Sequence, residues 1–421
     1  MVKVVVFEST PPEQVTSQVL RLVEDNASEL SSWSAPRSNI QYPLHQWALV
    51  TEVGQYLRLM GKLSSAPSGL IVALDEGSDV IGFVLYLPTP TNPEACGISY
   101  MAVAADARLQ GVARAMMVKL VTLRPHVGLT CTIPLVPVYE RLGLQVIEES
   151  DHPTQVVMNT RSYSTTALMR PLDVEDLFYS PEAKTFRQRF LRDHGMTAVT
   201  RSDEQIQRHV KQLQQQVQLY VSNRRAARWM PGAQSLAATV PDGEVLLRTF
   251  EVVLRYLVDN GLWGACHDSS AVLYMLLLEQ GVKAELIIGE VHAEGMYFDH
   301  SWVEVDGLIY DPAVGFPRTE DGKYVGPSVF ASRELAGLQV TTLGFGAVSP
   351  SGLRKTAQEV ATFDLKRYEK GQPAGTGIWD VAPRLAAKLG MKRVGRAFKL
   401  KYGTHVRTLR KVEEASLVAA D

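Results

Sequence analysis

The sequence has few cysteines, no long apolar run and almost no net charge. Its 421 residues include three cysteines, Cys96, Cys131 and Cys266, which are too few for a disulfide framework and lack the spacing of a metal site. We therefore expect no bound metal and a reducing, cytoplasmic compartment. No stretch is long enough for a transmembrane helix, and the apolar run after Met1 is too short for a signal peptide.

The nearly balanced charge argues against a partner that is attracted by the net charge of the whole protein. The chain has 43 Lys and Arg against 45 Asp and Glu, a formal net charge of −2, so nothing draws the whole molecule to nucleic acid or to a membrane. Hydrophobic residues make up 46% and charged residues 21%, as in ordinary globular proteins. The length allows two or three domains.

Residues 262–312 carry the strongest chemical pattern. Cys266 precedes an apolar run that ends at Gly281, which predicts a buried helix with the cysteine at its N-terminus. At that end the helix dipole favours the thiolate, the nucleophilic form of cysteine. The β-branched content of residues 282–288 predicts a strand after the helix.

A hairpin is predicted next, because Asp306-Gly307 separates two alternating runs. With these two residues as the turn, His300 and Asp311 are diagonal neighbours on one sheet face, about 7–8 Å apart at the backbone. A thiol, an imidazole and a carboxylate supply a nucleophile, a base and a group that orients the base. Taken singly, Cys266 could be a core residue, His300 a strand residue bonded to backbone, and Asp311 a turn residue.

Four features match in order over about residues 245–315: Gly-x-Cys opening a helix, Gly-Val-x-Ala-x-Leu-Ile, His-x-Trp-x-Glu-Val and Asp-Pro. This order resembles the transglutaminase-like superfamily of papain-type cysteine enzymes. The resemblance implies Cys266 as nucleophile, His300 as general base and acid, and Asp311 as the residue that orients His300. It also implies an α+β domain, over residues 246–350, that acts on amide or ester bonds through a thioester.

The second step of that chemistry is left open by the sequence. Water as acceptor would make the protein a cysteine protease or deamidase, and an amine would make it a transamidase, with a peptide, protein or amine as substrate. The arylamine acetyltransferases use a similar triad, but the Arg-Gly-Gly context usual before their cysteine is absent before Cys266.

Residues 1–160 read as alternating strands and helices. Strands are expected near residues 1–7, 69–74, 80–87 and 97–103, and helices over 11–26, 44–63 and from Gly111 to Leu123. A strand, a glycine-containing loop and a helix leave backbone N–H groups free at the helix N-terminus, where an anion such as a pyrophosphate binds. Arg108 and Arg114 add positive charge near this loop.

The loop Arg-x-x-Gly-x-Ala and the later Val-Tyr-Glu-Arg-Leu-Gly resemble the GCN5-related N-acetyltransferases, a family with a mixed α/β sheet. The resemblance implies acetyl-CoA or another acyl-CoA as cofactor, with Tyr139 as the acid that protonates the departing CoA thiolate. The implied cofactor-binding residues are Met101, Val103, Arg108, Gln110, Gly111, Val112, Ala113 and Arg114.

This segment departs from the family in two ways. The asparagine often found before the tyrosine is missing, and Glu94 is the nearest candidate for a general base by sequence. A purely structural interpretation makes Gly111 a helix-start glycine and Tyr139 a residue of an amphipathic helix.

The remaining segments are predicted to be a helical connector over residues 161–245 and a helical, basic tail over 351–421. From Val381 to Val412 no residue is acidic and ten are basic. We interpret the tail first as a solvated face or flexible segment, and alternatively as a site for an anionic partner such as a membrane or nucleic acid. The whole chain could also be a non-catalytic CoA-binding or scaffold protein in a larger assembly, such as a viral particle.

Overall fold

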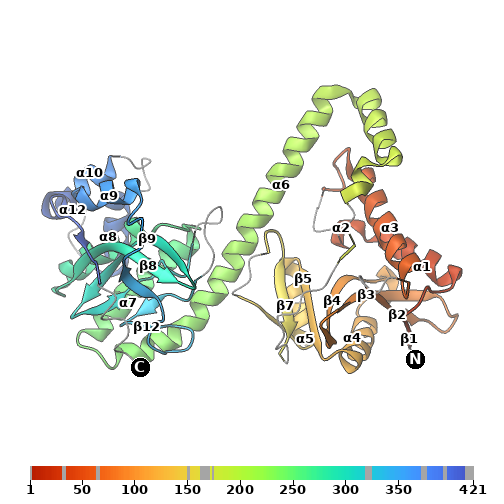
Figure 1. Cartoon of the computed structure of the whole chain (residues 1–421), viewed down its shortest axis with the longest axis horizontal. Coiled ribbons are helices and arrows are strands. Elements are labelled where there is room, and N and C mark those ends of the chain that lie inside the picture. The colour runs from red at the N-terminus through yellow and green to blue at the C-terminus, as the bar shows by residue number, and fades with distance from the viewer. Residues whose placement is uncertain are drawn as a thin grey trace. The chain divides into compact units, whose positions relative to one another are not determined.

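The computed structural model describes residues 2–30, 35–62, 67–148, 152–161, 171–172, 175–317, 325–370, 377–391 and 396–412 (Figure 1). The chain divides into two compact units, Met1–Gln218 and Leu219–Asp421. The division falls inside α6 (Pro181–Ala237), in the middle of the segment expected to be a separate connector. Gly195 has non-helical dihedral angles, φ 76 and ψ 162, so α6 is two helices that meet there.

The first unit is built on a mixed sheet, which confirms the expected fold class of this part. Among the described residues the strand order is β1-β2-β3-β4-β5-β7-β6, antiparallel except for the parallel pair β4 and β5. The strands are β1 (Lys3–Phe7), β2 (Gly69–Leu74), β3 (Val80–Thr89), β4 (Asn92–Val103), β5 (His126–Cys131), β6 (Leu144–Val146) and β7 (Val156–Thr160).

Helices cover both faces of this sheet. The helices are α1 (Glu13–Asp25), α2 (Ala27–Leu30), α3 (Tyr42–Leu59), α4 (Val112–Leu123) and α5 (Val136–Arg141). The apolar sides of α1 and α3 pack on the face that carries Val72, Phe83 and Leu85. On the opposite face α4 comes so close that a Cβ at Gly82 would lie 3.0 Å from the Met116 side chain, which explains the glycine there.

Strands β4 and β5 part in the middle of the sheet. Their parallel pairing covers residues 95–97 of β4 and 126–128 of β5. Just beyond, the register of β4 on β3 shifts by one residue at Ser99, a β-bulge that bends β4. The following residues of both strands line a cavity. The bulge and the parting of the strands therefore open the sheet where a ligand can enter.

The second unit packs helices against a smaller sheet. Its strand order is β10-β9-β8-β13, with β14 parallel to β8. The strands are β8 (Glu285–Ala293), β9 (Met296–Val305), β10 (Leu308–Tyr310), β13 (Gly344–Ala347) and β14 (Thr408–Leu409), and a separate hairpin joins β11 (Val329–Phe330) to β12 (Arg333–Glu334). Helices α7 (Gly243–Asp259) and α8 (Cys266–Glu279) bury Phe250, Leu254 and Leu273 in the core beside this sheet.

The described part of the C-terminal segment, up to residue 412, packs in this core, so the basic run from Val381 to Val412 is not a flexible tail where the structure describes it, although Lys388 and Lys399 lie on an exposed face. It forms α9 (Lys355–Thr362), α10 (Leu365–Glu369), α11 (Ile378–Lys388), α12 (Arg396–Tyr402) and then β14. Leu385, Phe398 and Tyr402 are buried in the core of the second unit. Lys392 and Arg393 of the basic run lie outside the described residues.

Two of the basic side chains are also engaged rather than free for an anionic partner. Arg407 is 3% exposed, and Arg410 forms ion pairs with Glu304 and Glu285. No described helix combines the length and the apolar character needed to span a bilayer.

Candidate active sites

Cys266 is the first residue of α8, as its sequence context predicts. Gly264, with φ 70, turns the chain into the helix, and Gly281, with φ 83, follows its end. The buried side of the helix is fixed to the sheet by hydrogen bonds, because Ser270 donates to Ser301 (3.1 Å) and Ser301 donates to the carbonyl of Ile287 (2.6 Å). Ser301 follows His300 in β9, so these bonds set the helix against the strand that carries the histidine.

The hairpin of β9 and β10 has the predicted register. Val305 pairs with Leu308, and Asp306 and Gly307 form the turn with φ values of 50 and 75. His300 is 4% exposed and Asp311 is fully buried, and His300 Nε2 lies 2.5 Å from Asp311 Oδ2.

The carboxylate of Asp311 is held from its other side. Its Oδ1 accepts hydrogen bonds from the backbone N–H groups of Ala313 (2.9 Å) and Val314 (3.2 Å). A carboxylate fixed by two backbone donors cannot turn away from the ring, so it sets the orientation of His300.

The other nitrogen of the His300 ring, Nδ1, is left for the sulfur of Cys266. Burial by itself lowers the pKa of His300, but the charges of Asp311 and Cys266, together with the hydrogen bond to Asp311, raise it to about 10. The ring therefore holds its proton at neutral pH. The structure thus brings together the three side chains that the sequence analysis selected in this half of the chain.

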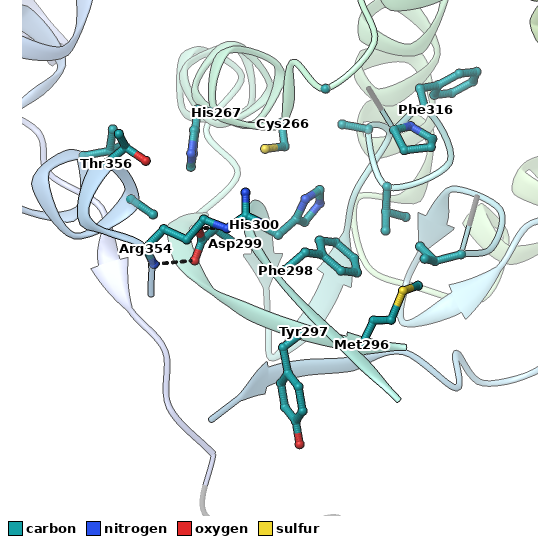
Figure 2. A pocket seen from close by; sticks show the side chains of 17 residues that line it. Cys266, His267, Met296, Tyr297, Phe298, Asp299, His300, Phe316, Arg354 and Thr356 are labelled. Carbon is teal, nitrogen blue, oxygen red and sulfur yellow. Dashed lines mark hydrogen bonds and ion pairs between the residues drawn. The ribbon is translucent and has the colours of Figure 1, made fainter. Parts of the chain in front are cut away.

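A cavity of about 770 Å³ opens onto this group and has two kinds of wall. Figure 2 shows Cys266 and His300 between an apolar side and a polar side. The apolar side carries Met296, Phe298, Val314, Phe316 and Val325, and the polar side carries Asp299, Arg354 and Thr356. The backbone N–H of Arg354 donates to Asp299 (3.1 Å), and burial raises the pKa of Asp299. The cavity can therefore take a ligand that is apolar on one side and polar on the other.

In the first unit the predicted loop has the geometry of an anion cradle. Gly111, with φ 83, is the N-cap of α4, and the first backbone bond of the helix runs from Ala115 N–H to Gly111 C=O (2.9 Å). The N–H groups of Val112, Ala113 and Arg114 therefore have no acceptor within the helix. A Cβ built on Gly111 meets no atom within 4 Å, so the space before these N–H groups is open.

The polar side chains of this loop are bonded to neighbouring residues or exposed. Arg108 donates to Asn26 (2.5 Å) and pairs with Glu29 (3.2 Å), so its charge is already shared with a carboxylate. Gln110 donates to the backbone carbonyl of Asp106 (2.6 Å), and Arg114 is exposed on α4. The backbone N–H groups, more than these side chains, are therefore the donors that an anion at this loop would meet.

A second cavity, of about 550 Å³, lies where β4 and β5 part. It is lined by Met101 of β4 and Tyr139 of α5, both selected from the sequence, whereas Val103 is half-buried at the end of β4. Burial raises the pKa of Tyr139, with a further contribution from Cys131, so its hydroxyl keeps its proton at neutral pH.

Sequence reasoning missed Glu52, an acidic residue in this cavity. It lies on α3 and accepts a hydrogen bond from the hydroxyl of Tyr100 (2.8 Å). Burial raises the pKa of Glu52, although the bond from Tyr100 opposes the rise. Glu94, the candidate from sequence, is 70% exposed beside His126 and does not line the cavity. The sequence feature that could have identified Glu52 is its position between Leu49 and Tyr56, which lie on the buried face of a predicted helix.

Comparisons with known proteins bear on the first unit. Residues 28–144 match the model of the "Acetyltransferase (GNAT) family". A nourseothricin acetyltransferase structure is 21% identical, with a TM-score of 0.20, over 22% of this chain and 64% of its own length. The diaminobutyrate acetyltransferase EctA from Paenibacillus lautus, solved with its substrate and coenzyme A, is 20% identical, with a TM-score of 0.25, over 38% of this chain and 95% of its own.

A histone acetyltransferase HPA2 and related acetyltransferase structure from Corynebacterium glutamicum is 17% identical, with a TM-score of 0.29, over 39% of this chain and 99% of its own. A comparison with curated proteins finds no match. The family match ends at residue 144, so the transglutaminase-like resemblance of the second unit stays a prediction.

Proposed function

We propose, from the GNAT acetyltransferase domain over residues 28–144, that the first unit transfers an acetyl group from acyl-CoA to an amine. The family match carries this proposal. Two features of the chain support it: the open anion cradle at the start of α4 and the cavity between the parted strands. Acetyl-CoA supplies the acetyl group as a thioester when it is bound.

The residues of the cradle fit a pyrophosphate. The N–H groups of Val112, Ala113 and Arg114 would hold it at the positive end of the helix dipole, and Gly111 leaves room for its oxygens. Met101 would lie along the pantetheine arm, because β4 has no strand partner on its β5 side at this level among the described residues.

Two side chains in the cavity can move protons. A carboxylate with a raised pKa is a stronger base, so Glu52 would take the proton of an ammonium substrate at one of its carboxylate oxygens. Tyr139 would hold a proton at its hydroxyl oxygen for the leaving thiolate, since burial raises its pKa. The amine then attacks as a neutral nucleophile.

Calorimetry with acetyl-CoA, followed by an assay of free CoA thiol with a panel of amines, tests this function. We expect binding, and thiol release that depends on both the amine and Glu52. Heat of binding without thiol release would favour the non-catalytic CoA-binding alternative. The absence of heat with the wild-type protein would refute both.

A second activity is proposed for the second unit because of one observation, the placement of His300 between Cys266 and Asp311. The thiolate of Cys266 attacks a carbonyl carbon of an amide or ester, and the backbone N–H at the start of α8 faces the developing oxyanion. His300 gives its Nδ1 proton to the leaving amine or alkoxide, and a thioester remains on the sulfur.

The thioester is resolved by an acceptor. Water or an amine attacks the carbonyl, His300 takes the proton of the acceptor, and the sulfur leaves as thiolate. Hydrolysis corresponds to a protease or deamidase, and amine attack to a transamidase.

Incubation with activated esters tests this step. We expect a burst of leaving group and a mass increase at Cys266, both lost in Cys266→Ala and His300→Ala. A wild-type protein with neither would leave the scaffold alternative for this unit.

A further inference from the structure

Arg407 lies buried beside the first turn of α8, although it belongs to the basic C-terminal run. Its side chain is 3% exposed. Its Nη2 donates a 3.0 Å hydrogen bond to the carbonyl oxygen of His267, the residue that follows Cys266. Its guanidinium carbon lies 4.4 Å from the centre of the Tyr368 ring. The position of Arg407 is fixed by β14, which pairs with β8 directly after it.

The guanidinium of Arg407 forms no direct ion pair with a described carboxylate. Its Nε and Nη1 are buried and have no hydrogen-bond partner in the described part of the chain. The nearby carboxylate of Asp268 accepts its bond from the Tyr368 hydroxyl (2.7 Å), and no described carboxylate pairs with Arg407 within 4.0 Å. A buried cation without a direct ion pair is unfavourable for folding, so its presence beside a candidate nucleophile suggests a use.

We infer, on the basis of the proposed thiol chemistry, that Arg407 is a positioning residue for Cys266. It holds the first turn of α8 through the His267 carbonyl, and its buried charge favours the thiolate of Cys266 over the neutral thiol. It is not among the residues that line the cavity, so it acts on substrate only through the sulfur.

Electrostatic contact between the two groups supports this role. Burial lowers the pKa of Arg407, while Tyr368, Asp268 and the Cys266 thiolate raise it. His300 of β9 also interacts electrostatically with Cys266, so positive charges carried by two different elements act on the sulfur. The titratable and charged groups around the sulfur are His267 and Asp268 of α8, Asp299 and His300 of β9, Asp311, Arg354, Tyr368 of α10 and Arg407.

The pH dependence of Cys266 alkylation by iodoacetamide, followed by peptide mass mapping on the full chain, tests this inference. Arg407→Met removes the charge and keeps an unbranched side chain, and its melting transition shows whether the variant folds before its alkylation is measured. We expect its alkylation midpoint to rise by about one pH unit, which is about tenfold slower alkylation below both midpoints. Arg407→Lys keeps the positive charge, so its alkylation midpoint should lie close to that of the wild type.

Arg410→Gln is the matched control. It removes the same charge three residues further on, where Arg410 pairs with Glu304 and Glu285. Its midpoint should match the wild type even if its melting temperature falls. Should Arg407→Met not fold, Arg407→Gln is the second neutral variant, with the same expected rise.

The outcomes separate the inference from the function on which it rests. If wild-type Cys266 alkylates no faster than an unstructured cysteine peptide, and His300→Ala changes nothing, the thiol function fails. If the wild-type thiol is activated but a folded, neutral Arg407 variant keeps the wild-type midpoint, the thiol function stands and the role of Arg407 is overturned. A rise in both Arg407→Lys and the neutral variant would assign the effect to packing rather than to charge, which also overturns it.

Discussion

Replacement of Asp311 by asparagine should lower the pKa of His300 more than any other single change in the second unit. In the wild type this pKa is raised from 6.5 to about 10. The difference corresponds to roughly 5 kcal/mol between the two protonation states, since one pH unit is about 1.4 kcal/mol. The charge of Asp311 is the largest influence that raises the pKa, and burial opposes it.

Asp311→Asn keeps the shape of the side chain and removes that charge. Burial then acts with less opposition, so we expect the pKa of His300 to fall toward or below 6.5. The charge of Cys266 raises the pKa of His300 less than that of Asp311, so Cys266→Ala should lower this pKa by a smaller amount. The expected order of the His300 pKa is therefore wild type, then Cys266→Ala, then Asp311→Asn.

NMR titration of protein with isotope-labelled histidine rings measures these values. The chain has nine histidines, and the signal that disappears in His300→Gln identifies the ring. A wild-type ring that titrates near 6.5, or an Asp311→Asn ring that titrates above the wild type, would refute the reasoning.

Stability gives an independent readout with a fixed sign. His300 binds its proton more tightly in the folded protein, so the protonated ring stabilises the fold. This contribution is fully present below pH about 6.5 and is lost as the pH rises toward about 10. His300→Gln should therefore lower the free energy of unfolding more at pH 6 than at pH 10, as measured by denaturant titration.

Three further changes test other parts of the molecule. Gly111→Glu should abolish acetyl-CoA binding in calorimetry because its side chain enters the open cradle, whereas Gly281→Glu, with the same φ of 83 and equally open surroundings, should bind normally. Glu52→Gln should lower kcat/KM for acetyl transfer by about 10²–10⁴-fold without weakening acetyl-CoA binding, the usual range for loss of a general base; an unchanged rate would show that another group takes the proton. Trp302→Ala, at a fully buried ring packed edge-on against Phe345, should reduce the free energy of unfolding by about 3–5 kcal/mol in denaturant titration.

Local patterns in the sequence predicted the elements that carry Cys266, His300 and Asp311, because each of these elements is defined by residues close together in the chain. The turn at Asp306-Gly307 sets the register of the hairpin, and an apolar run between glycines sets the start of α8. Each of these depends on neighbouring residues, so periodicity and turn chemistry were enough. The contact of α8 with β9 next to His300 depends on the hydrogen bond between Ser270 and Ser301. No local sequence pattern predicts this bond.

The C-terminal run was interpreted differently from the structure because composition says nothing about partners in the fold. Its many basic residues favoured a solvated tail, yet Phe398 and Tyr402 are buried and β14 joins the sheet through β8, about 120 residues earlier in the chain. Glu52 was missed for a similar reason. An acid on a helix is ordinarily solvated, and only the approach of Tyr100 from β4 makes this one a partly buried, hydrogen-bonded group.

The hairpin that joins β9 to β10 makes the His300–Asp311 pair sensitive to changes in length. The two residues are 11 positions apart in the chain, and the turn between them has two residues. Deletion or insertion of a single codon between them would move one arm of the ribbon by one position and turn its side chain to the opposite surface. Length variation elsewhere in surface loops of the second unit leaves this pair intact, so any circular permutation or loop graft in this half of the chain should be cut outside the segment from His300 to Asp311.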